Sequence, residues 1–392
     1  MSGIKNKKIL IAAAAVIAAV LLLVLLLGSG SQKLHETADI TVWYADDNLM
    51  AEKLEDYVRN FNESNGTELN VSVSARGFSS ESSLVDSVRN AVKNDGSLPD
   101  VIIGSADISA YLQSKDKLTD LTMYLKQHDI NGCDDGMLEA CTYKDRILSL
   151  PLAAEADVLI INRGLYSEIP ESFEALCDAA NRYYSENKEY FFTVSNYSSF
   201  FNSAMAQLGE QFNAENPFEY ENDNVRHIYD QLATAAFKRG YTAVRENPAE
   251  IVARGELACA IVSASQIMEA ADNLDMSKIE LMPCPCMESG EAVYVPRVIS
   301  ACILKSDSNT ETGAALFLDW LASDKDNTGF ALGSGLIPAR GSIPHSNSQV
   351  YNALMKTVNA MDFRFYAANA NYALKSIDFN SIIDTIMKKS LS

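Results

Sequence analysis

The stretch from residue 143 to residue 163, YKDRILSLPLAAEADVLIINR, decides the fold class of this protein. It holds two apolar runs of strand length, residues 147–151 and 158–162, with an alanine-rich segment between them. Short apolar runs of this kind are typical of strands that are buried on both faces of a sheet. We therefore expect two buried strands that follow each other closely along the chain.

Outward from this stretch, strand patterns alternate with helical patterns. We expect further strands at residues 40–44, 69–73, 101–104, 257–262, 279–283 and 299–304. Helical spacing of apolar residues, or a capping residue, predicts helices at residues 50–62, 83–92, 172–184, 197–208, 225–237, 312–322, 324–332, 350–358 and 377–389. Such alternation predicts an α/β fold of βαβ units around a mostly parallel sheet.

An apolar segment of membrane-spanning length lies near the N-terminus. Lys5, Lys7 and Lys8 precede an uninterrupted apolar run of 19 residues, 9–27. As a helix this run would span about 28 Å, close to the roughly 30 Å hydrocarbon core of a bilayer. The lysines predict that residues 1–8 stay in the cytoplasm and that the chain after the span lies outside. We therefore expect a transmembrane anchor.

A cleaved secretory signal is the alternative to an anchor. Small residues follow the apolar run, so cleavage after Gly30 or Ser31 is compatible with the sequence. No cysteine precedes Cys133, which excludes a lipid-modified N-terminal cysteine. In both cases we expect residues 28–37 to form a linker and the rest of the chain to fold outside the cytoplasm.

Length and charge restrict the class of protein further. With 392 residues, of which 47% are hydrophobic, the chain is long enough for two lobes and a targeting segment. Its net charge is -20, from 32 basic and 52 acidic residues. A surface of this charge repels nucleic acid and anionic lipid headgroups, so we expect no nucleic-acid partner.

The sequence contains no pattern that indicates catalysis or a bound metal. Glycine-rich phosphate loops, G-x-S-x-G and H-E-x-x-H are all missing from the sequence. The seven cysteines are an odd number, so at least one is unpaired, and most lie in apolar stretches as small buried side chains. The close pair Cys284 and Cys286 lacks further metal ligands nearby. We expect neither an enzyme, nor a metal site, nor a cofactor.

Four segments in order resemble the extracellular solute-binding proteins of ABC importers, of the sugar-binding type (family 1). The segments are ITVWY and the helix after it at residues 40–62, LPDVIIG and its continuation at 98–121, the stretch at 143–176, and the C-terminal part ending in GLIPAR at 300–340. Each motif alone is weak, but their order and spacing extend across nearly the whole exported chain. The chain is therefore identified as a member of this family.

The resemblance implies a two-lobed fold like that of periplasmic binding proteins, with hinge crossings and a ligand cleft between the lobes. Residues 38–151 plus 289–335 would form the first lobe, and residues 152–288 plus 336–392 the second. Closing two such lobes around a solute removes the solute from water and fixes its partners.

The resemblance also implies a function at the outer face of the cell membrane. The protein would capture a small solute, with a carbohydrate as the expected class, and deliver it to the permease subunits of an ABC importer. An acidic sugar, a phosphorylated solute or a polyol are open alternatives, because the chain has only two tryptophans. A membrane-anchored sensor or accessory protein with altered or lost ligand binding is the alternative function.

Candidate ligand contacts follow from the rule that ligands lie beyond the carboxyl ends of strands in open α/β sheets. Trp43, Tyr44 and Asp46 lie at the end of the first expected strand, and Ser105 and Asp107 follow the strand at 101–104. Aromatic faces and carboxylates suit sugars. Since neighbouring strand residues face opposite sides, only one of Trp43 and Tyr44 should face the cleft. Asp46 and Asp107 have helix caps as their alternative role.

Four more candidates lie near the expected crossings or in a helix. Glu155 is similar in position to a hinge acid that binds sugar hydroxyls in some family members, and its alternative is a solvated hinge residue. Tyr197 opens an expected helix and could instead be a core residue. Tyr294 and Arg297 lie where many members of the family have glycines and a tryptophan. Arg297 could contact an anionic or hydroxylated solute, or pair with surface acids.

Overall fold

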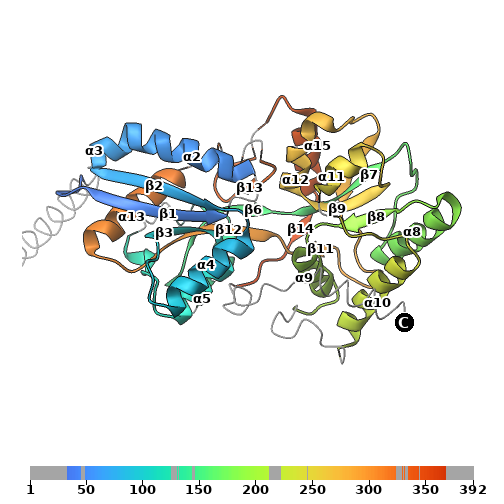
Figure 1. Ribbon diagram of the computed structural model, residues 1–392, viewed down its shortest axis with the longest axis horizontal. Coiled ribbons are helices and arrows are strands. Elements are labelled where there is room, and N and C mark those ends of the chain that lie inside the picture. Colours follow the sequence, from blue (N-terminus) through green and yellow to red (C-terminus); the bar gives the residue numbers. More distant parts are fainter. Residues whose placement is uncertain are drawn as a thin grey trace, which may run out of the picture.

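The protein folds into two lobes that lie side by side, each built around its own sheet (Figure 1). The computed structural model describes residues 33–45, 49–124, 130, 132–143, 146–211, 222–244, 246–323, 329, 331, 334–343 and 345–367.

Six strands form the sheet of the first lobe, in the order β13, β6, β12, β3, β1, β2. Their bounds are β1 Ala38–Ala45, β2 Val71–Phe78, β3 Val101–Ser105, β6 Leu150–Glu155, β12 Arg297–Ile303 and β13 Ile337–Pro338. β1 runs parallel to β2 and β3. β12 is antiparallel to β3 and β6, and β13 is antiparallel to β6.

Four strands form the sheet of the second lobe, in the order β10, β7, β9, β8. Their bounds are β7 Asp157–Asn162, β8 Phe192–Val194, β9 Cys259–Ser263 and β10 Ile279–Pro283. β8 and β9 are parallel, whereas β7 is antiparallel to both of its neighbours. Two short pairs complete the strands: β4 Thr142–Tyr143 with β5 Arg146–Ile147, and β11 Val293–Tyr294 with β14 Asp362–Phe363.

The prediction of a mostly parallel sheet is wrong, because both sheets are mixed. The cause is the hinge. β12 and β7 enter their lobes from the crossings, so each starts at the sheet edge where its neighbours β3 and β9 end. A strand that starts where its neighbours end must run antiparallel to them.

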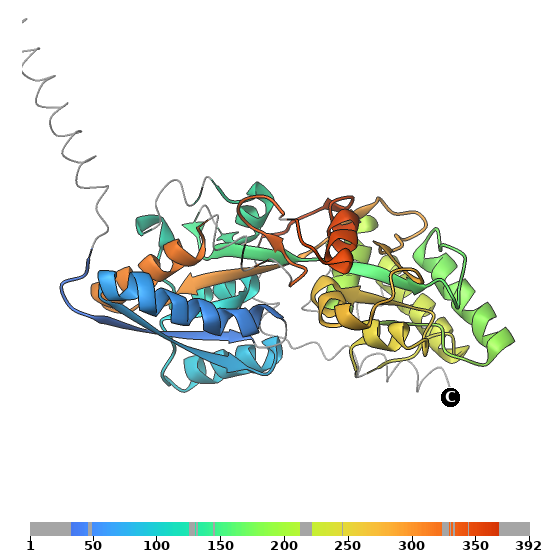
Figure 2. The same cartoon turned by 90° about the horizontal axis from the view of Figure 1, so that it is seen from above.

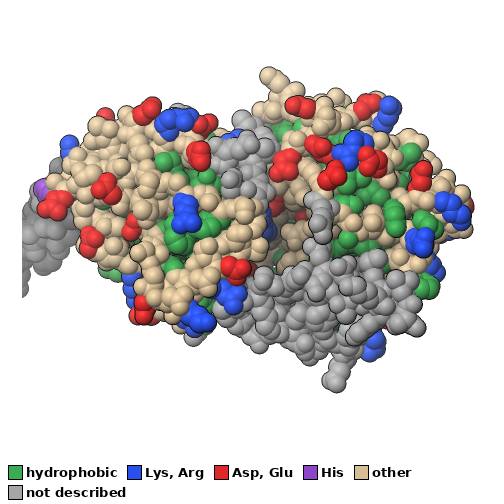
Figure 3. Space-filling view, in the orientation of Figure 1, with side chains coloured by type: hydrophobic (Ala, Val, Ile, Leu, Met, Phe, Trp, Pro, Cys, Tyr) green, Lys and Arg blue, Asp and Glu red, His purple; other side chains and the backbone are tan. Residues whose placement is uncertain are grey.

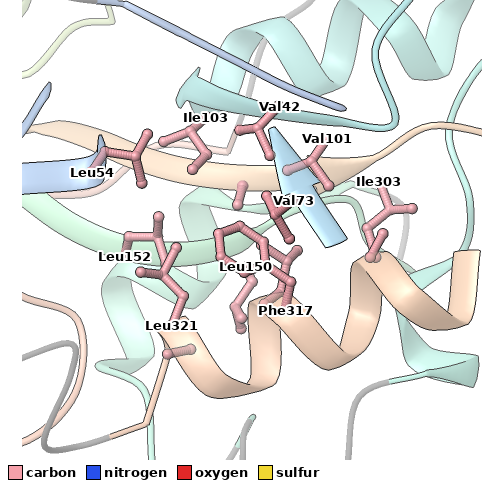
Figure 4. Close-up of a cluster of buried hydrophobic side chains, with 14 of the residues drawn as sticks. Val42, Leu54, Val73, Val101, Ile103, Leu150, Leu152, Ile303, Phe317 and Leu321 are labelled. Atoms are coloured by element: carbon pink, nitrogen blue, oxygen red, sulfur yellow. The ribbon is translucent and has the colours of Figure 1, made fainter. Parts of the chain in front are cut away.

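The helices of the first lobe cover both faces of its sheet (Figures 1 and 2). They are α2 Leu49–Phe61, α4 Glu81–Lys93, α5 Ala106–Ser114, α7 Asp135–Ala140 and α13 Ser308–Leu321, with the short elements η1 Asn62–Gly66, α3 Thr67–Leu69 and η2 Leu121–Met123. On one face, Val42, Val101 and Leu150 pack with Phe317 of α13 in a core that excludes water (Figure 4). Burial of these apolar side chains is the main stabilising contribution to the lobe.

The helices of the second lobe also lie on both faces of their sheet. They are α8 Phe173–Asn187, α9 Tyr197–Gln207, α10 Asp223–Phe237, α11 Pro248–Ala253, α12 Ala264–Glu269 and α15 Gln349–Val358, with the short turn η3 Ala271–Asn273. Leu159 and Ile161 of β7 pack in the cluster that contains α8, α9 and α10. Val158 and Ile160 pack on the opposite face with α11, α12 and α15. Because helices cover both faces of this sheet, residues 158–161 of β7 are all apolar.

The chain passes between the lobes at the middle of the molecule (Figure 2). β6 leads through Ala156 directly into β7, and the segment after β10 returns to β12. A third passage follows Gly335, whose φ is +77° and where a β-carbon would lie 2.5 Å from the Ala264 carbonyl oxygen. Only glycine tolerates both this backbone conformation and this close approach. The predicted lobe boundaries at residues 151, 288 and 335 stay a prediction.

Three predicted segments fall largely or wholly outside the described residues: the apolar run 9–27 and the helices at 324–332 and 377–389. Within the part of the chain that is described, we find no helix with the length and apolar character of a membrane span.

The seven cysteines are free thiols, and five of them are buried. Cys141 illustrates their environment: burial raises the pKa of its thiol to about 12. Thiols of this kind are unreactive and pack as small apolar side chains.

Candidate ligand-binding site

Strand ends and helix starts gather at the hinge. In the first lobe, β3 ends at Ser105, which caps α5 and lies opposite Ile299 near the start of β12. In the second lobe, β9 ends at Ser263, which caps α12 and lies opposite Asp157 at the start of β7. Helix starts with free backbone N–H groups and short polar caps are common ligand-binding positions in α/β proteins.

Glu155 is the centre of a polar network in the hinge. The residue is buried and lies at the last position of β6, opposite Arg297 in the strand pairing. Oε2 accepts hydrogen bonds from Arg297 Nη2 at 2.6 Å and Nε at 3.2 Å. Oε1 accepts one from the Ser265 hydroxyl, which belongs to α12 of the second lobe. Glu155 therefore connects a crossing strand with a helix of the second lobe.

The charge on Glu155 is stabilised by its partners. Burial would raise the pKa of this carboxyl, but the Arg297 guanidinium and the hydrogen bonds from Ser265, Arg297 and Ser263 lower it below its ordinary value. A buried carboxylate persists only when it is paired and hydrogen-bonded in this way.

Arg297 extends the network into the first lobe. Its Nη1 donates to Oε2 of Glu81 at 3.2 Å, and Glu81 is the first residue of α4. Oε1 of Glu81 accepts a hydrogen bond of 2.9 Å from the backbone N–H of Ser105. The side chains of Arg297 and Glu81 are 24% and 25% exposed, whereas that of Glu155 is 5% exposed. Arg297 and Glu81 are thus the members of the network that water or a solute can reach.

A pocket adjoins this network on the side of the second lobe. It is small, with a cavity volume of about 20 Å³, and lies between α9 and the segment that crosses back to β12. Its lining is mostly apolar or aromatic, with few polar groups. Its lining includes Asp157, Phe200, Ser203, Cys284, Tyr294 and Phe363. Pockets of this composition are typical of small-molecule sites.

Asp157 is the charged side chain of this pocket. The residue as a whole has intermediate exposure, but its Oδ2 is buried and has no hydrogen-bond partner among the residues that the structure describes. Burial raises the pKa of the carboxyl to about 7, and the nearby charge of Glu155 raises it too. A hydrogen bond from Ser199 and the charge of Arg297 oppose this shift. A carboxyl perturbed by burial in a pocket is a candidate functional group.

Tyr294 shapes one wall of the pocket. Its hydroxyl donates to the Cys284 carbonyl oxygen at 3.0 Å and lies 3.4 Å from the Cys286 sulfur. These contacts hold the cysteine pair in the crossing segment. In the described ranges, no group of three or more His, Cys, Asp or Glu side chains is arranged to hold a metal ion.

The two aromatic candidates at the end of β1 lie in different environments. Tyr44 is 2% exposed in the first-lobe core, and its hydroxyl donates to Glu55 at 3.3 Å. This placement disfavours Tyr44 as a ligand contact, because its ring faces are covered by core residues. Trp43 is partly exposed, but its ring packs at 5.1 Å on Phe78 and has the Arg76 guanidinium 5.5 Å from its centre.

The remaining candidates divide between the hinge and the lobe interiors. Ser105 contacts the network through its backbone N–H, which donates to Glu81. Asp107 lies in the first turn of α5 instead. Its charge adds to the effect of burial in raising the pKa of the Cys141 thiol. Tyr197 is 5% exposed in the second-lobe core. Asp46 lies outside the described residues. The hinge network thus connects Ser105, Glu155 and Arg297, while Tyr294 lines the adjoining pocket. The binding roles of these four residues stay predictions.

Asp157 and Glu81 are the residues that sequence reasoning missed. Asp157 is an acid at the start of an otherwise apolar strand, and this contrast was a usable signal. The strand-end rule did not select it, because it marks the beginning of an antiparallel strand. Glu81 lies in a serine-rich segment after β2, where it looks like an ordinary first-turn acid.

Charges elsewhere on the surface are mixed. On the face shown in Figure 3, Lys and Arg side chains stand among acidic ones and form no broad basic area in the described part. Exposed pairs such as Arg254 with Glu256 at 2.6 Å contribute little to stability.

Comparison with known proteins gives a family match across most of the chain. The family model described as "Bacterial extracellular solute-binding protein" matches residues 56–357. A curated relative, the maltotriose-binding protein of Pyrococcus abyssi, is 29% identical over 112 residues. That alignment spans 29% of this chain and 25% of the relative, so this chain matches about a quarter of the relative's length.

Solved structures share the fold at low sequence identity. The maltose-bound MalE3 protein of T. maritima has a TM-score of 0.72 and 15% identity, over 90% of this chain and 95% of its own. An ABC substrate-binding protein from Listeria monocytogenes, in complex with cycloalternan, has a TM-score of 0.72 and 13% identity, over 91% of this chain and 95% of its own. These similarities establish the two-lobed periplasmic-binding-protein-like fold.

Proposed function

Because the chain belongs to the bacterial extracellular solute-binding protein family, we propose that it captures a carbohydrate outside the cytoplasm and delivers it to the permease subunits of an ABC importer. The observation that carries the proposal is the hinge network, in which Glu155 and Arg297 connect helix starts of both lobes beside a pocket. Sugar ligands of similar proteins, maltose and cycloalternan by their names, support the carbohydrate class.

In this proposal the solute makes its polar contacts with the exposed part of the network. Arg297 and Glu81 can offer N–H donors and a carboxylate to sugar hydroxyls, while Glu155 positions the guanidinium of Arg297. Trp43, Ser105 and Tyr294 remain further candidates. A solute held by groups from both lobes favours the closed arrangement, because it binds that state more tightly than the open one.

The proposal includes a place at the membrane and excludes catalysis. We propose that the apolar run 9–27 anchors the chain and that the lobes lie at the extracellular face of the cell membrane. The family consists of solute-binding proteins, and we propose that this member catalyses no reaction. No observation favours the sensor or accessory role over import.

A thermal-shift screen tests the capture of a solute. The full chain is purified in a detergent without a sugar headgroup and heated with sugars, sugar acids, polyols, phosphosugars, amino acids and small peptides. A solute at 100 times its Kd should stabilise the protein by about 2.7 kcal/mol, which raises the unfolding midpoint measurably.

A matched pair of variants locates the effect at the hinge. Arg297→Gln should lose most of the shift, whereas Arg182→Gln should keep it, because Arg182 is 62% exposed on α8. A chain whose midpoint responds to none of the solute classes, or an Arg297→Gln variant that binds like the wild type, contradicts the proposal.

A further inference from the structure

One oxygen of the Asp157 carboxyl is unsatisfied, and the hinge network does not use it. This atom, Oδ2, is buried without a hydrogen-bond partner in the described part of the chain, and the residue lines the pocket beside α9. Buried polar atoms without a partner are rare in native proteins and call for a physical reason. A ligand group that donates a hydrogen bond to Oδ2 would supply that reason.

The surrounding charges favour a positive ligand group over a neutral one. Asp157 is near Glu155 and Arg297, and Arg297 also pairs with Glu81. The positive charge of Arg297 is therefore already shared by the carboxylates of Glu81 and Glu155, and the Asp157 carboxylate adds a further negative charge. An ammonium group in the pocket would offset the remaining negative charge, and a hydroxyl would not. Charge-assisted hydrogen bonds are also about twice as strong as neutral ones.

The aromatic lining points the same way. Phe200, Tyr294 and Phe363 line the pocket that holds the Asp157 carboxyl. Aromatic faces attract cations through the ring quadrupole, and this attraction grows when the cation is removed from water. A carboxylate among aromatic rings accommodates neutral sugars as well as organic amines, and the excess of negative charge at the hinge is what favours the amine.

We propose that Asp157 makes this pocket a subsite for a protonated amine on the captured solute, so that the preferred ligand is an amine-bearing carbohydrate. The inference rests on the proposed function and adds to it the chemical class of the solute. The Ser199 hydroxyl is hydrogen-bonded to the carboxyl and can orient it toward the amine.

The pH dependence of binding follows from the groups that face Asp157. Burial raises the pKa of Asp157 to about 7. The pKa of Glu155 is lowered and that of the Cys284 thiol lies well above its ordinary value, while Arg297 stays charged throughout. Of these four groups, Asp157 is the one that changes its charge between pH 6 and pH 8. Preference for an amine should therefore increase over this interval.

The test compares solutes that differ by one amine in place of one hydroxyl. Glucose with 6-amino-6-deoxyglucose and sorbitol with N-methylglucamine are titrated into the full chain at pH 6 and pH 8 by calorimetry. The wild type should bind the amine member about tenfold more tightly at pH 8, as expected for a charged hydrogen bond. This preference should shrink at pH 6.

Two variants separate the subsite from the general effect of charge. Asp157→Asn should bind both members of each pair within about twofold at both pH values, since the amide carries no charge. Asp230→Asn removes the same charge from an exposed position on α10 and should behave like the wild type. Thermal unfolding of the free variants checks that each is folded.

The outcomes distinguish the inference from the proposed function. Tight binding of the neutral members without an amine preference, or an amine preference that survives in Asp157→Asn, overturns the inference and leaves solute capture intact. Absence of binding for every member of the pairs and for the wider panel overturns both.

Discussion

Replacing Asp157 by asparagine should stabilise the protein, and the gain should depend on pH. The pKa of this carboxyl is about 7 in the folded protein against 3.8 ordinarily, and burial is the main cause. Because the folded-state pKa is raised, the folded state binds the proton more tightly than the unfolded chain does. The free energy of unfolding therefore falls as pH rises from about 4 to 7 and is constant above that interval.

The size of the effect follows from the shift. A raise of roughly three pKa units, at about 1.4 kcal/mol per unit, costs the folded state roughly 4 kcal/mol once the carboxyl is ionised. Asparagine keeps the shape of the side chain and removes this cost. Asp157→Asn should exceed the wild type by up to roughly 4 kcal/mol at pH 8 and by less than about 1 kcal/mol at pH 4.

Urea denaturation at pH 4, 5, 6, 7 and 8 measures the difference. Every other ionisable group is common to both proteins, so subtracting one free energy of unfolding from the other isolates Asp157. Asp230→Asn serves as the control and should differ from the wild type by less than about 0.5 kcal/mol at each pH. A constant difference between Asp157→Asn and the wild type from pH 4 to pH 8 refutes the reasoning.

Three further predictions concern stability. Glu155→Ala should cost about 1.5–3 kcal/mol in urea denaturation, because Arg297 loses its buried partner but keeps Glu81. Glu155→Ala with Arg297→Met should cost clearly less than the sum of the two single changes. Ser263→Ala removes the capping box of α12 and should lower the free energy of unfolding by about 1 kcal/mol in the same assay. An unchanged free energy of unfolding would show that the cap does not stabilise the protein. Leu150→Ala should cost about 2–5 kcal/mol, and exposed Phe237→Ala less than about 0.5 kcal/mol; equal losses would contradict the assigned core.

Local sequence patterns placed most elements correctly. The strand predicted at residues 279–283 has the observed bounds of β10, and Ser172 caps α8 by accepting a hydrogen bond from the Ala175 N–H at 3.1 Å. Apolar periodicity and short polar caps act within a few residues, so they can be read along the chain. The direction of a strand relative to its neighbours cannot be read from such local patterns, and the prediction of mostly parallel strands was therefore wrong.

The error in strand direction also explains the omission of Asp157. The candidate rule selects residues after strands, on the assumption that parallel strands end at the ligand-binding edge. β7 starts at that edge, so its first residue, Asp157, meets Ser263 at the end of β9. The hinge that turned β7 around thus placed a carboxyl where the rule does not look.

Most helices and strands, the membership of a two-lobed family and the candidacy of Glu155 and Arg297 could be inferred from the amino-acid sequence alone. The partners of these charges became visible in the folded protein: Arg297 reaches Glu81 across 216 positions of the sequence, and Glu155 reaches Ser265 across 110. The tertiary structure also decided that Tyr44 is a core residue and that Asp157 lines a pocket. The physical reason is range, because helices and strands follow from neighbouring residues, whereas burial and ion pairing depend on segments that meet only when both lobes are folded around the hinge.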